Sequence, residues 1–353
     1  MKYKILIFFL IMLFPLVLSK NKEIKKRDSD KLIISKVEAW KGKKSVEFKL
    51  LLKIGTDDFD KEEYIFGGIT DIEVDQHGNI YVLDFKNYRI QKFAQDGKFL
   101  QSYGGIKGVG PGEFSEPRRF ALDSQNNLYI TDLSPPRIII LDSKGVFKKS
   151  ITLRFYPGDI IVGKSGKLYI TDVRSKSKYW VHRFNVFNGE LEGSFCEKNN
   201  KDILIYTSYT GNLCSDKDGN IYYSFFYPYE IRKYSENGEL LLSFSRKAPF
   251  FKPPFRDEMG IIRPESGTWD IISLPDGKII HLIRDLNFKN KEFYSYLDFF
   301  DENGRWLLSI PSAEVDQDWK ESVIANDYQG NIYLTFSEPF PHIRKYSMKF
   351  IEK

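Results

Sequence analysis

The stretch Gly78–Gly104, GNIYVLDFKNYRIQKFAQDGKFLQSYG, contains three short runs rich in Tyr, Ile, Val and Phe. These runs are Asn79–Asp84, Tyr88–Phe93 and Lys98–Gly104, and each is bounded by Gly, Asp or Asn. β-Branched and aromatic residues favour strands, whereas Gly, Asp and Asn favour the tight turns that join them. The stretch therefore predicts an antiparallel meander, and a further strand over Asp71–Asp75 brings the unit to four strands.

The bend at Asp75–Tyr81, Asp-x-x-Gly-Asn-Ile-Tyr in outline, returns along the whole chain in more or less degenerate form. The position of Gly78 repeats at residues 126, 166, 219, 277 and 330, in steps of 48, 40, 53, 58 and 53 residues. Units of about 40–50 residues with four strands each are typical of propeller blades. The repeats therefore predict an all-β fold, a six-bladed β-propeller with four-stranded antiparallel blades.

The last repeat has room for only three strands, because six residues follow the strand expected at Ile343–Ser347. Near the start of the chain, Leu51–Gly55 resembles the blade-ending Leu100–Gly104. We expect residues 46–55 to supply the outer strand of the last blade, since an open array would expose strand edges that promote aggregation. The alternative is that Met348–Glu352 folds back as that outer strand.

The beginning of the chain has the features of an export signal. Lys2 and Lys4 precede the apolar run Ile5–Leu18, whose 14 residues are fewer than the ~20 that a membrane-spanning helix needs. We expect residues 1–19 to be a secretory signal peptide, with no stable membrane span once it is cleaved. An uncleaved anchor is the alternative. The protein is accordingly expected to be exported, to the periplasm, the cell surface or the medium.

Residues 20–45 are rich in charge, and we expect a solvated tether there. Residues 46–353 would then form the propeller. The net charge of +5 is mild and its charges are interspersed, which argues against a dedicated nucleic-acid binder and suits a monomer. Cys196 and Cys214 could form a disulfide bond in an exported protein, but a chain of this size does not need one for stability. We therefore expect two half-buried thiols.

The chain resembles a known repeat family. Gly78–Gly104 and the linker GGIKGVGPGEFSEP at residues 104–117 resemble the NHL-repeat consensus, and the whole of residues 46–347 looks like an exported bacterial six-bladed NHL-like propeller. The resemblance implies a fold strongly and a function only weakly. Some related six-bladed propellers are gluconolactonase-like metal hydrolases, and another is the lyase that completes peptide amidation.

Loops that enter the innermost strands of a propeller surround the mouth of its central channel. When the six repeats are aligned on Asp75, the positions equivalent to Asp71 and Thr70 carry mostly polar or charged side chains. A mixed acidic and basic ring with one indole would suit a polar small molecule, a glycan or a peptide end. We expect the following residues to bind a ligand at this mouth: Asp71, Arg118, Arg119, Asp159, Asn212, Trp269 and Asp270.

Four of these residues offer hard oxygen ligands, which suit Ca²⁺ or the metal of a hydrolase with one carboxylate as base. This predicted metal set consists of Asp71, Asp159, Asn212 and Asp270. The lyase resemblance implies three histidine ligands around the axis instead. The four histidines occupy non-equivalent positions, so that site is not expected: His77, His182, His281 and His342. The alternative to any ligand is a channel filled by salt bridges and water.

The longest insertion, Arg246–Gly267, interleaves prolines with Phe250, Phe251 and Phe255. It is either a flap that grips a ligand beside the channel or an apolar cover over a junction between blades. The sequence as a whole predicts an exported, non-catalytic binding or scaffold propeller that recognises a protein, peptide or glycan. A metal-dependent hydrolase or lyase of the gluconolactonase-like type is the alternative, although no Gly-x-Ser-x-Gly motif supports covalent hydrolysis.

Overall fold

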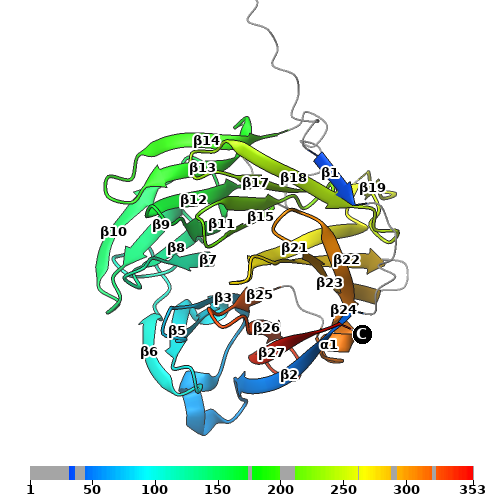
Figure 1. Ribbon diagram of the computed structural model, residues 1–353. Helices are drawn as coiled ribbons and strands as arrows, with labels where there is room; N and C mark the ends of the chain where they lie inside the picture. Colours follow the sequence, from blue (N-terminus) through cyan, green and yellow to red (C-terminus); the bar gives the residue numbers. More distant parts are fainter. Residues whose placement is uncertain are drawn as a thin grey trace, which may run out of the picture.

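The computed structural model describes residues 32–35, 44–173, 177–198, 211–260, 262–287, 292–319 and 323–352. Within these ranges, six sheets are arranged radially around a central axis, and β19 (Phe255–Arg256) and β20 (Ile262–Arg263) form a separate two-stranded sheet (Figure 1). The first strand of each sheet is innermost, and each inner strand contacts the inner strands of both neighbouring sheets, so the ring is closed. The predicted six-bladed propeller is confirmed.

Each blade is a four-stranded antiparallel meander. Blade 1 contains β3 (Ile69–Val74), β4 (Ile80–Asp84), β5 (Arg89–Phe93) and β6 (Phe99–Gly104), and blade 2 contains β7 (Pro117–Leu122), β8 (Leu128–Leu133), β9 (Pro136–Leu141) and β10 (Phe147–Thr152). Blade 3 contains β11 (Pro157–Val162), β12 (Lys167–Asp172), β13 (Tyr179–Asn185) and β14 (Leu191–Glu197).

The second half of the ring follows the same plan. Blade 4 contains β15 (Asn212–Ser215), β16 (Ile221–Ser224), β17 (Ile231–Tyr234) and β18 (Leu240–Arg246), and blade 5 contains β21 (Ser266–Ser273), β22 (Ile279–Asn287), β23 (Glu292–Phe300) and β24 (Trp306–Pro311). Blade 6 contains β25 (Ile324–Asn326), β26 (Ile332–Phe336), β27 (His342–Glu352) and β2 (Lys44–Ile54). Helical structure in the described ranges is limited to α1 (Ser312–Val315) and the short 3-10 elements η2 (Phe59–Tyr64) and η3 (Phe85–Asn87).

Strand β2 closes the ring. It pairs antiparallel with β27 from Lys44 opposite Glu352 to Ile54 opposite Ile343, and Ile54 is 2% exposed. The predicted N-terminal closure is confirmed. The alternative is wrong, because Met348–Glu352 continues β27 and does not turn back as a separate strand.

Strand β1 (Leu32–Ser35) was not expected. It pairs in parallel with β18, from Leu32 opposite Ser243 to Ser35 opposite Arg246, and gives the sheet of blade 4 a fifth strand (Figure 1). An outer strand presents unpaired backbone groups that another strand satisfies. The expected tether over residues 20–45 is therefore interrupted by this strand, and its last two residues belong to β2. Its other residues and the predicted signal peptide lie outside the described residues.

The core lies between blades. Along β4, Tyr81 and Leu83 pack in a cluster with residues of blade 2, whereas Val82 packs with residues of blade 6. Every residue of β4 is buried, since successive side chains of a strand point to opposite faces and both faces are covered. This arrangement explains the unbroken apolar runs in the second strands of the repeats.

The repeated Asp-x-x-Gly-Asn bend is an Asp-capped turn between the first two strands of a blade. Asp75 Oδ1 accepts the backbone N–H groups of His77 and Asn79, both at 2.9 Å, and its Oδ2 accepts Asn79 Nδ2 at 2.8 Å. Gly78 has φ +79°, a conformation that favours glycine. The same carboxylate caps occur in blades 2, 4 and 6, at Asp123, Asp216 and Asp327.

Replacing Asp327 with alanine is expected to lower the free energy of unfolding by about 3 kcal/mol. Its buried carboxylate accepts two backbone N–H groups, the Asn331 amide and the Tyr333 hydroxyl, and it lies 2.9 Å from Lys345 Nζ. Urea denaturation measures the loss. Asp301→Ala is the matched control, because Asp301 caps an exposed turn, and about 1 kcal/mol or less is expected there. Equal losses in the two variants would contradict the assignment.

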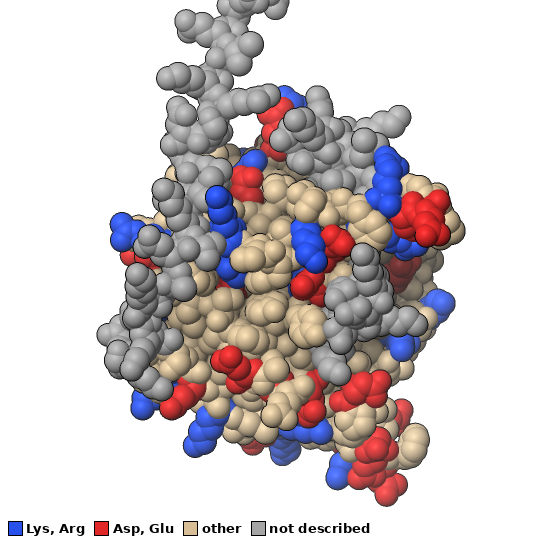
Figure 2. Space-filling model, turned by 90° about the vertical axis from the view of Figure 1, so that its right-hand side faces the viewer, with Lys and Arg blue, Asp and Glu red and all other residues tan. Residues whose placement is uncertain are grey.

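Cys196 and Cys214 are free thiols, as expected, but both are buried and not half-buried. Burial raises the pKa of the Cys196 thiol to about 12. Across the described ranges, no helix is both long and apolar enough to cross a membrane. Acidic and basic side chains are interspersed on the face shown in Figure 2, in agreement with the mixed charge of the sequence.

Candidate ligand site at the central channel

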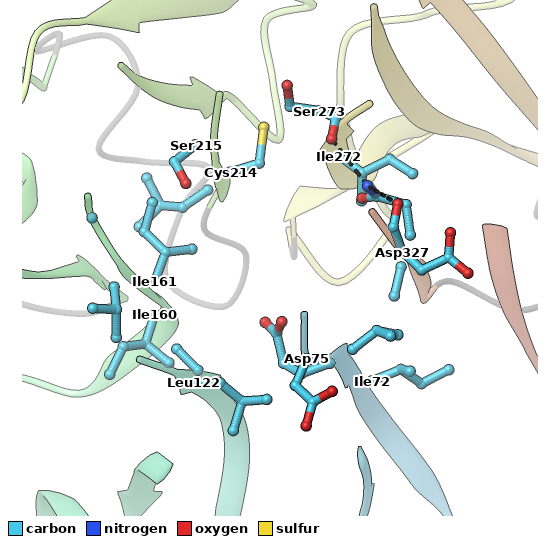
Figure 3. Close-up of a pocket in the computed structure, with 18 of the residues that line it drawn as sticks. Ile72, Asp75, Leu122, Ile160, Ile161, Cys214, Ser215, Ile272, Ser273 and Asp327 are labelled. Atoms are coloured by element: carbon cyan, nitrogen blue, oxygen red, sulfur yellow. Dashed lines mark hydrogen bonds between the residues drawn. The ribbon is translucent and has the colours of Figure 1, made fainter. Parts of the chain in front are cut away.

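The channel contains two cavities. The turn-side cavity has a volume of about 650 Å³ and lies at the end where the first two strands of each blade are joined; its apolar lining includes Ile72, Leu122, Ile161, Cys214 and Ile272 (Figure 3). The loop-side cavity, of about 480 Å³, lies at the other end and is lined by residues that include Thr70, Arg118, Tyr156, Asn212 and Trp269. Arg119 and Asp159 line both cavities, so they lie where the two meet.

Three aspartates and one arginine form this junction, which we call the waist: Asp71, Asp159, Asp270 and Arg119. The aspartates occupy equivalent positions of the repeats, on the inner strands of blades 1, 3 and 5. One oxygen of each accepts the N–H of the following residue at 2.9–3.0 Å. The other oxygen accepts an N–H from the next blade, as in Asp71 to Phe120 at 2.8 Å, Asp159 to Leu213 at 2.7 Å and Asp270 to Ile324 at 3.1 Å. Each carboxylate therefore joins two blades.

Arg119 carries the positive charge of the waist. Its Nη1 donates to Asp71 Oδ1 at 3.2 Å and to the carbonyl of Thr70 at 3.1 Å, and lies 3.9 Å from Asp270 Oδ2. Burial opposes the charged form of Arg119, but the carboxylates of Asp71, Asp270 and Asp159 outweigh it and raise the pKa of the guanidinium. Arg119 is therefore a fixed cation.

The acids of the waist outnumber this cation. Burial raises the pKa of Asp71 to about 6 and that of Asp270 to about 7, although Arg119 opposes both shifts. Burial also raises the pKa of Asp159, and that of Glu73, which faces the same carboxylates, lies well above its usual range. One guanidinium does not neutralise four acids in a buried site, so the waist holds protons near neutral pH.

The residues of the waist do not fit a metal centre. Within the part of the chain that the structure describes, no group of three or more His, Cys, Asp or Glu side chains is placed to hold a metal ion. The oxygens of the three aspartates already accept backbone N–H groups, and the guanidinium of Arg119 lies among them. The predicted metal set of Asp71, Asp159, Asn212 and Asp270 is therefore corrected to a set of contacts between blades, with Asn212 on the loop side.

The predicted ligand residues reach the channel but separate into two groups. Arg118, Asn212 and Trp269 line the loop-side cavity, together with Arg119 and Asp159. Asp71 and Asp270 line the turn-side cavity. Buried histidines lie elsewhere: His281, for instance, stacks on Tyr229 with ring centroids 5.1 Å apart, between blades 4 and 5.

Several channel residues escaped the sequence analysis. Glu73 lies two residues after Asp71 on β3, so strand periodicity alone would have placed it on the same face. Tyr156 and Glu116 lie in the loops that lead into blades 3 and 2, and both line the loop-side cavity. Phe226 packs edge-on against Trp269 with ring centroids 5.2 Å apart, and no repeat pattern marks it.

The first part of the Arg246–Gly267 insertion covers the junction of blades 4 and 5. Phe250 stacks on Tyr296 with ring centroids 4.3 Å apart, and Phe251 stacks on Tyr227 at 5.9 Å. Farther along, the segment forms the small hairpin of β19 (Phe255–Arg256) and β20 (Ile262–Arg263). These contacts favour the apolar cover over the ligand-gripping flap.

Sequence comparison identifies the class of protein. The model of the family DUF5128, described as a 6-bladed beta-propeller, matches residues 56–244, which is more than half of the chain. The chain belongs to this family of six-bladed propellers. The resemblance of residues 78–117 to the NHL consensus stays a prediction. A comparison with curated proteins finds no match.

Solved structures share the fold at low sequence identity. A Bacteroides fragilis protein described as exported is 14% identical, with a TM-score of 0.62 over 90% of this chain and 99% of that one. Virginiamycin B lyase from Staphylococcus aureus is 16% identical, with a TM-score of 0.54 over 85% and 99%. A gluconolactonase from Xanthomonas campestris is 14% identical, with a TM-score of 0.51 over 85% and 99%. Because exported proteins and enzymes share this fold, the fold does not decide between binding and catalysis.

Proposed function

We propose that the protein is an exported binding propeller whose channel is a non-catalytic site, which takes a glycan, a peptide or a segment of a protein into the loop-side cavity. The observation that carries the proposal is the lining of this cavity, where the aromatic side chains of Tyr156 and Trp269 adjoin the polar side chains of Arg118, Asn212 and Glu116. A volume of about 480 Å³ lies within the usual range for sites that take small ligands.

The cavity combines two kinds of recognition. An indole beside the channel offers a flat apolar surface to a sugar ring or to an apolar side chain. The guanidinium of Arg118 and the amide of Asn212 supply directional hydrogen bonds to hydroxyl, carbonyl or carboxylate oxygens. Arg284 stacks over the ring of Trp269 at 5.2 Å, which holds the indole in place from one side. A ligand therefore meets a largely preformed surface.

The waist supports binding over metal-dependent catalysis. A metal hydrolase needs carboxylates that are free to coordinate the ion, with one of them available as a base. The waist aspartates instead accept backbone N–H groups from two blades. We therefore propose no metal or cofactor for this protein.

Two further parts of the proposal come from the sequence. Export is supported by the basic start and apolar run at residues 2–18, and by the fold shared with a protein described as exported. A monomeric state without a nucleic-acid partner is supported by the closed ring and by the mild, interspersed charge.

Replacing Trp269 with alanine is expected to weaken ligand binding by at least about tenfold, because a buried aromatic contact is lost. Glycan and peptide arrays would first identify the strongest binder, and isothermal titration calorimetry with that compound would then measure the change. Tyr328→Ala is the control, because Tyr328 is exposed and lines the turn-side cavity. An equal loss in both variants would place the ligand outside the loop-side cavity.

A further inference from the structure

A serine recurs at one register in the outer strands of five blades. In each case the serine lies directly opposite a residue of the third strand. The pairs are Ser102 and Gln91, Ser150 and Ile139, Ser194 and His182, Ser243 and Arg232, and Ser309 and Asp298. Among these five pairs, only the one in blade 3 places the hydroxyl against an imidazole.

The blade 3 pair continues into a third residue. Ser194 Oγ lies 2.7 Å from His182 Nδ1, and His182 Nε2 lies 3.3 Å from Asp172 Oδ2. The three side chains come from three neighbouring strands, β12, β13 and β14, and form one hydrogen-bonded chain across the sheet. A hydroxyl bonded to an imidazole whose other nitrogen is bonded to a carboxylate is the arrangement that activates serine nucleophiles.

Burial is graded along this chain of side chains. Asp172 is 0% exposed and His182 is 5% exposed, whereas Ser194 is half-buried on the outermost strand. The ring of His182 packs against Phe155 with ring centroids 4.7 Å apart, and Lys198 Nζ lies 3.5 Å from Asp172 Oδ2. The base and its carboxylate are therefore held inside the blade, and Ser194 is the least buried of the three residues.

We propose that Ser194 is a nucleophile that hydrolyses small carboxylic esters, with His182 as the general base and Asp172 as the positioning residue. Neutral His182 with its proton on Nε2 donates to Asp172, which leaves Nδ1 to accept the proton of the Ser194 hydroxyl. In the usual triad, Nε2 takes the serine proton and Nδ1 donates to the carboxylate; in His182 the two nitrogens are interchanged. Either ring nitrogen can act as the base when the serine hydroxyl lies within hydrogen-bond distance of it.

The proposed reaction has two halves. Ser194 Oγ bonds to the acyl carbon while its proton passes to His182 Nδ1; the ester C–O bond then breaks, and the proton leaves with the alcohol. Water attacks the acyl-serine, gives its proton to Nδ1, and the C–Oγ bond breaks as that proton returns to Ser194. Ester and water therefore become acid and alcohol, with no other reactant.

The edge position of β14 supplies one backbone hydrogen-bond donor for the oxyanion. Within the described residues, β14 is the outermost strand of its sheet. Backbone N–H groups of an antiparallel strand alternate between facing the neighbouring strand and facing outward. Of the N–H groups of Ser194 and Phe195, one is therefore directed outward, close to the hydroxyl.

A fluorophosphonate probe tests the nucleophile directly on the full-length protein. Ser194 Oγ would bond to phosphorus as fluoride leaves and the proton passes to His182. We expect one adduct per chain, located at Ser194 by peptide mass spectrometry and absent from Ser194→Ala. His182→Gln is expected to slow labelling by at least about 100-fold, and Asp172→Asn by at least about tenfold. Thermal unfolding of each variant separates this loss from a loss of structure.

Two exposed serines are matched controls. Ser102 and Ser150 occupy the same register and are more exposed than Ser194, but they face Gln91 and Ile139. Ser150→Ala is expected to leave both labelling and the hydrolysis of p-nitrophenyl acetate unchanged, whereas Ser194→Ala abolishes both. The proposal is overturned by the absence of a Ser194 adduct in the native protein. Labelling of Ser102 or Ser150 at a similar rate, or folded His182→Gln labelled at the native rate, also overturns it. None of these outcomes bears on ligand binding at the channel.

Discussion

Replacing Arg119 with methionine is expected to lower the free energy of unfolding by about 3–5 kcal/mol near pH 8, because removing one partner of a buried charge cluster leaves the others uncompensated. The guanidinium bonds to Asp71, lies 3.9 Å from Asp270, and attracts Asp159. Methionine fills a similar volume without the charge, so the change isolates electrostatics from packing. Guanidinium chloride denaturation measures the difference.

The loss of unfolding free energy in Arg119→Met should become smaller as the pH falls. The native waist holds protons on Asp270 and Asp71, whose pKa values are raised to about 7 and about 6, whereas the same groups in the unfolded chain release theirs near pH 3.8. A raised carboxyl pKa therefore contributes stability at low pH that is lost as the pH rises from about 4 to about 7. Without Arg119 the carboxyl pKa values rise further, so the variant should recover much of its deficit near pH 5.

Arg118 provides the matched control for this prediction. It is the neighbouring residue and has the same side chain, but it is exposed on the loop side of the channel. Arg118→Met is expected to change stability by less than about 1 kcal/mol, with little dependence on pH. A deficit in Arg119→Met that stays constant from pH 8 to pH 5 would show that the waist carboxyls are not the groups that Arg119 stabilises.

Removal of strand β2 is expected to abolish cooperative folding. A chain that starts at Thr56 lacks the outer strand of blade 6, so β27 keeps its pairing with β26 but loses its outer partner from Ile343 to Glu352. The apolar side chains of Phe48 and Ile54, which pack against blades 5 and 6 and against blades 1 and 6 respectively, are lost with it. We expect aggregation on size-exclusion chromatography and no sharp thermal transition in circular dichroism.

A chain that starts at Lys44 is the control for this truncation. It lacks β1 but keeps β2, so it should remain a folded monomer with a sharp transition. A synthetic peptide of residues 44–55 should restore a cooperative transition to the shorter chain, because the missing strand pairs through its own backbone. If the chain that starts at Thr56 unfolds as sharply as the control, β2 is not what closes the ring.

The repeats made the fold predictable because their signals are local. The Asp-x-x-Gly-Asn bend at Asp75 is a self-contained turn, and the apolar runs after it are strands that are buried on both faces. Strand β1 was missed because a four-residue run in a charged segment carries no periodic signal, and its position depends on the open edge of β18. The partners of Phe250 and Phe251, in blades 5 and 4, could not be predicted either, because these contacts also depend on residues far away in the sequence.

The candidate site was predictable by position but not by role. Alignment of the repeats placed Asp71, Asp159 and Asp270 on the channel, because equivalent residues of repeated blades converge on one axis. Their partners are backbone N–H groups of the next blade, which sequence patterns do not reveal. The metal prediction therefore counted oxygen ligands correctly and missed that those oxygens were already engaged.

The alternation of the waist has a mechanical consequence. Carboxylates join blade 1 to blade 2, blade 3 to blade 4 and blade 5 to blade 6, whereas the equivalent residues of blades 2, 4 and 6 are Arg119, Asn212 and Val323. The junction of blades 4 and 5 is held instead by the ion pair of Arg246 with Asp298 and by hydrogen bonds from Thr268 to the carbonyls of Phe225 and Phe226. Loss of one waist aspartate should therefore loosen one junction of the ring and leave the other five held.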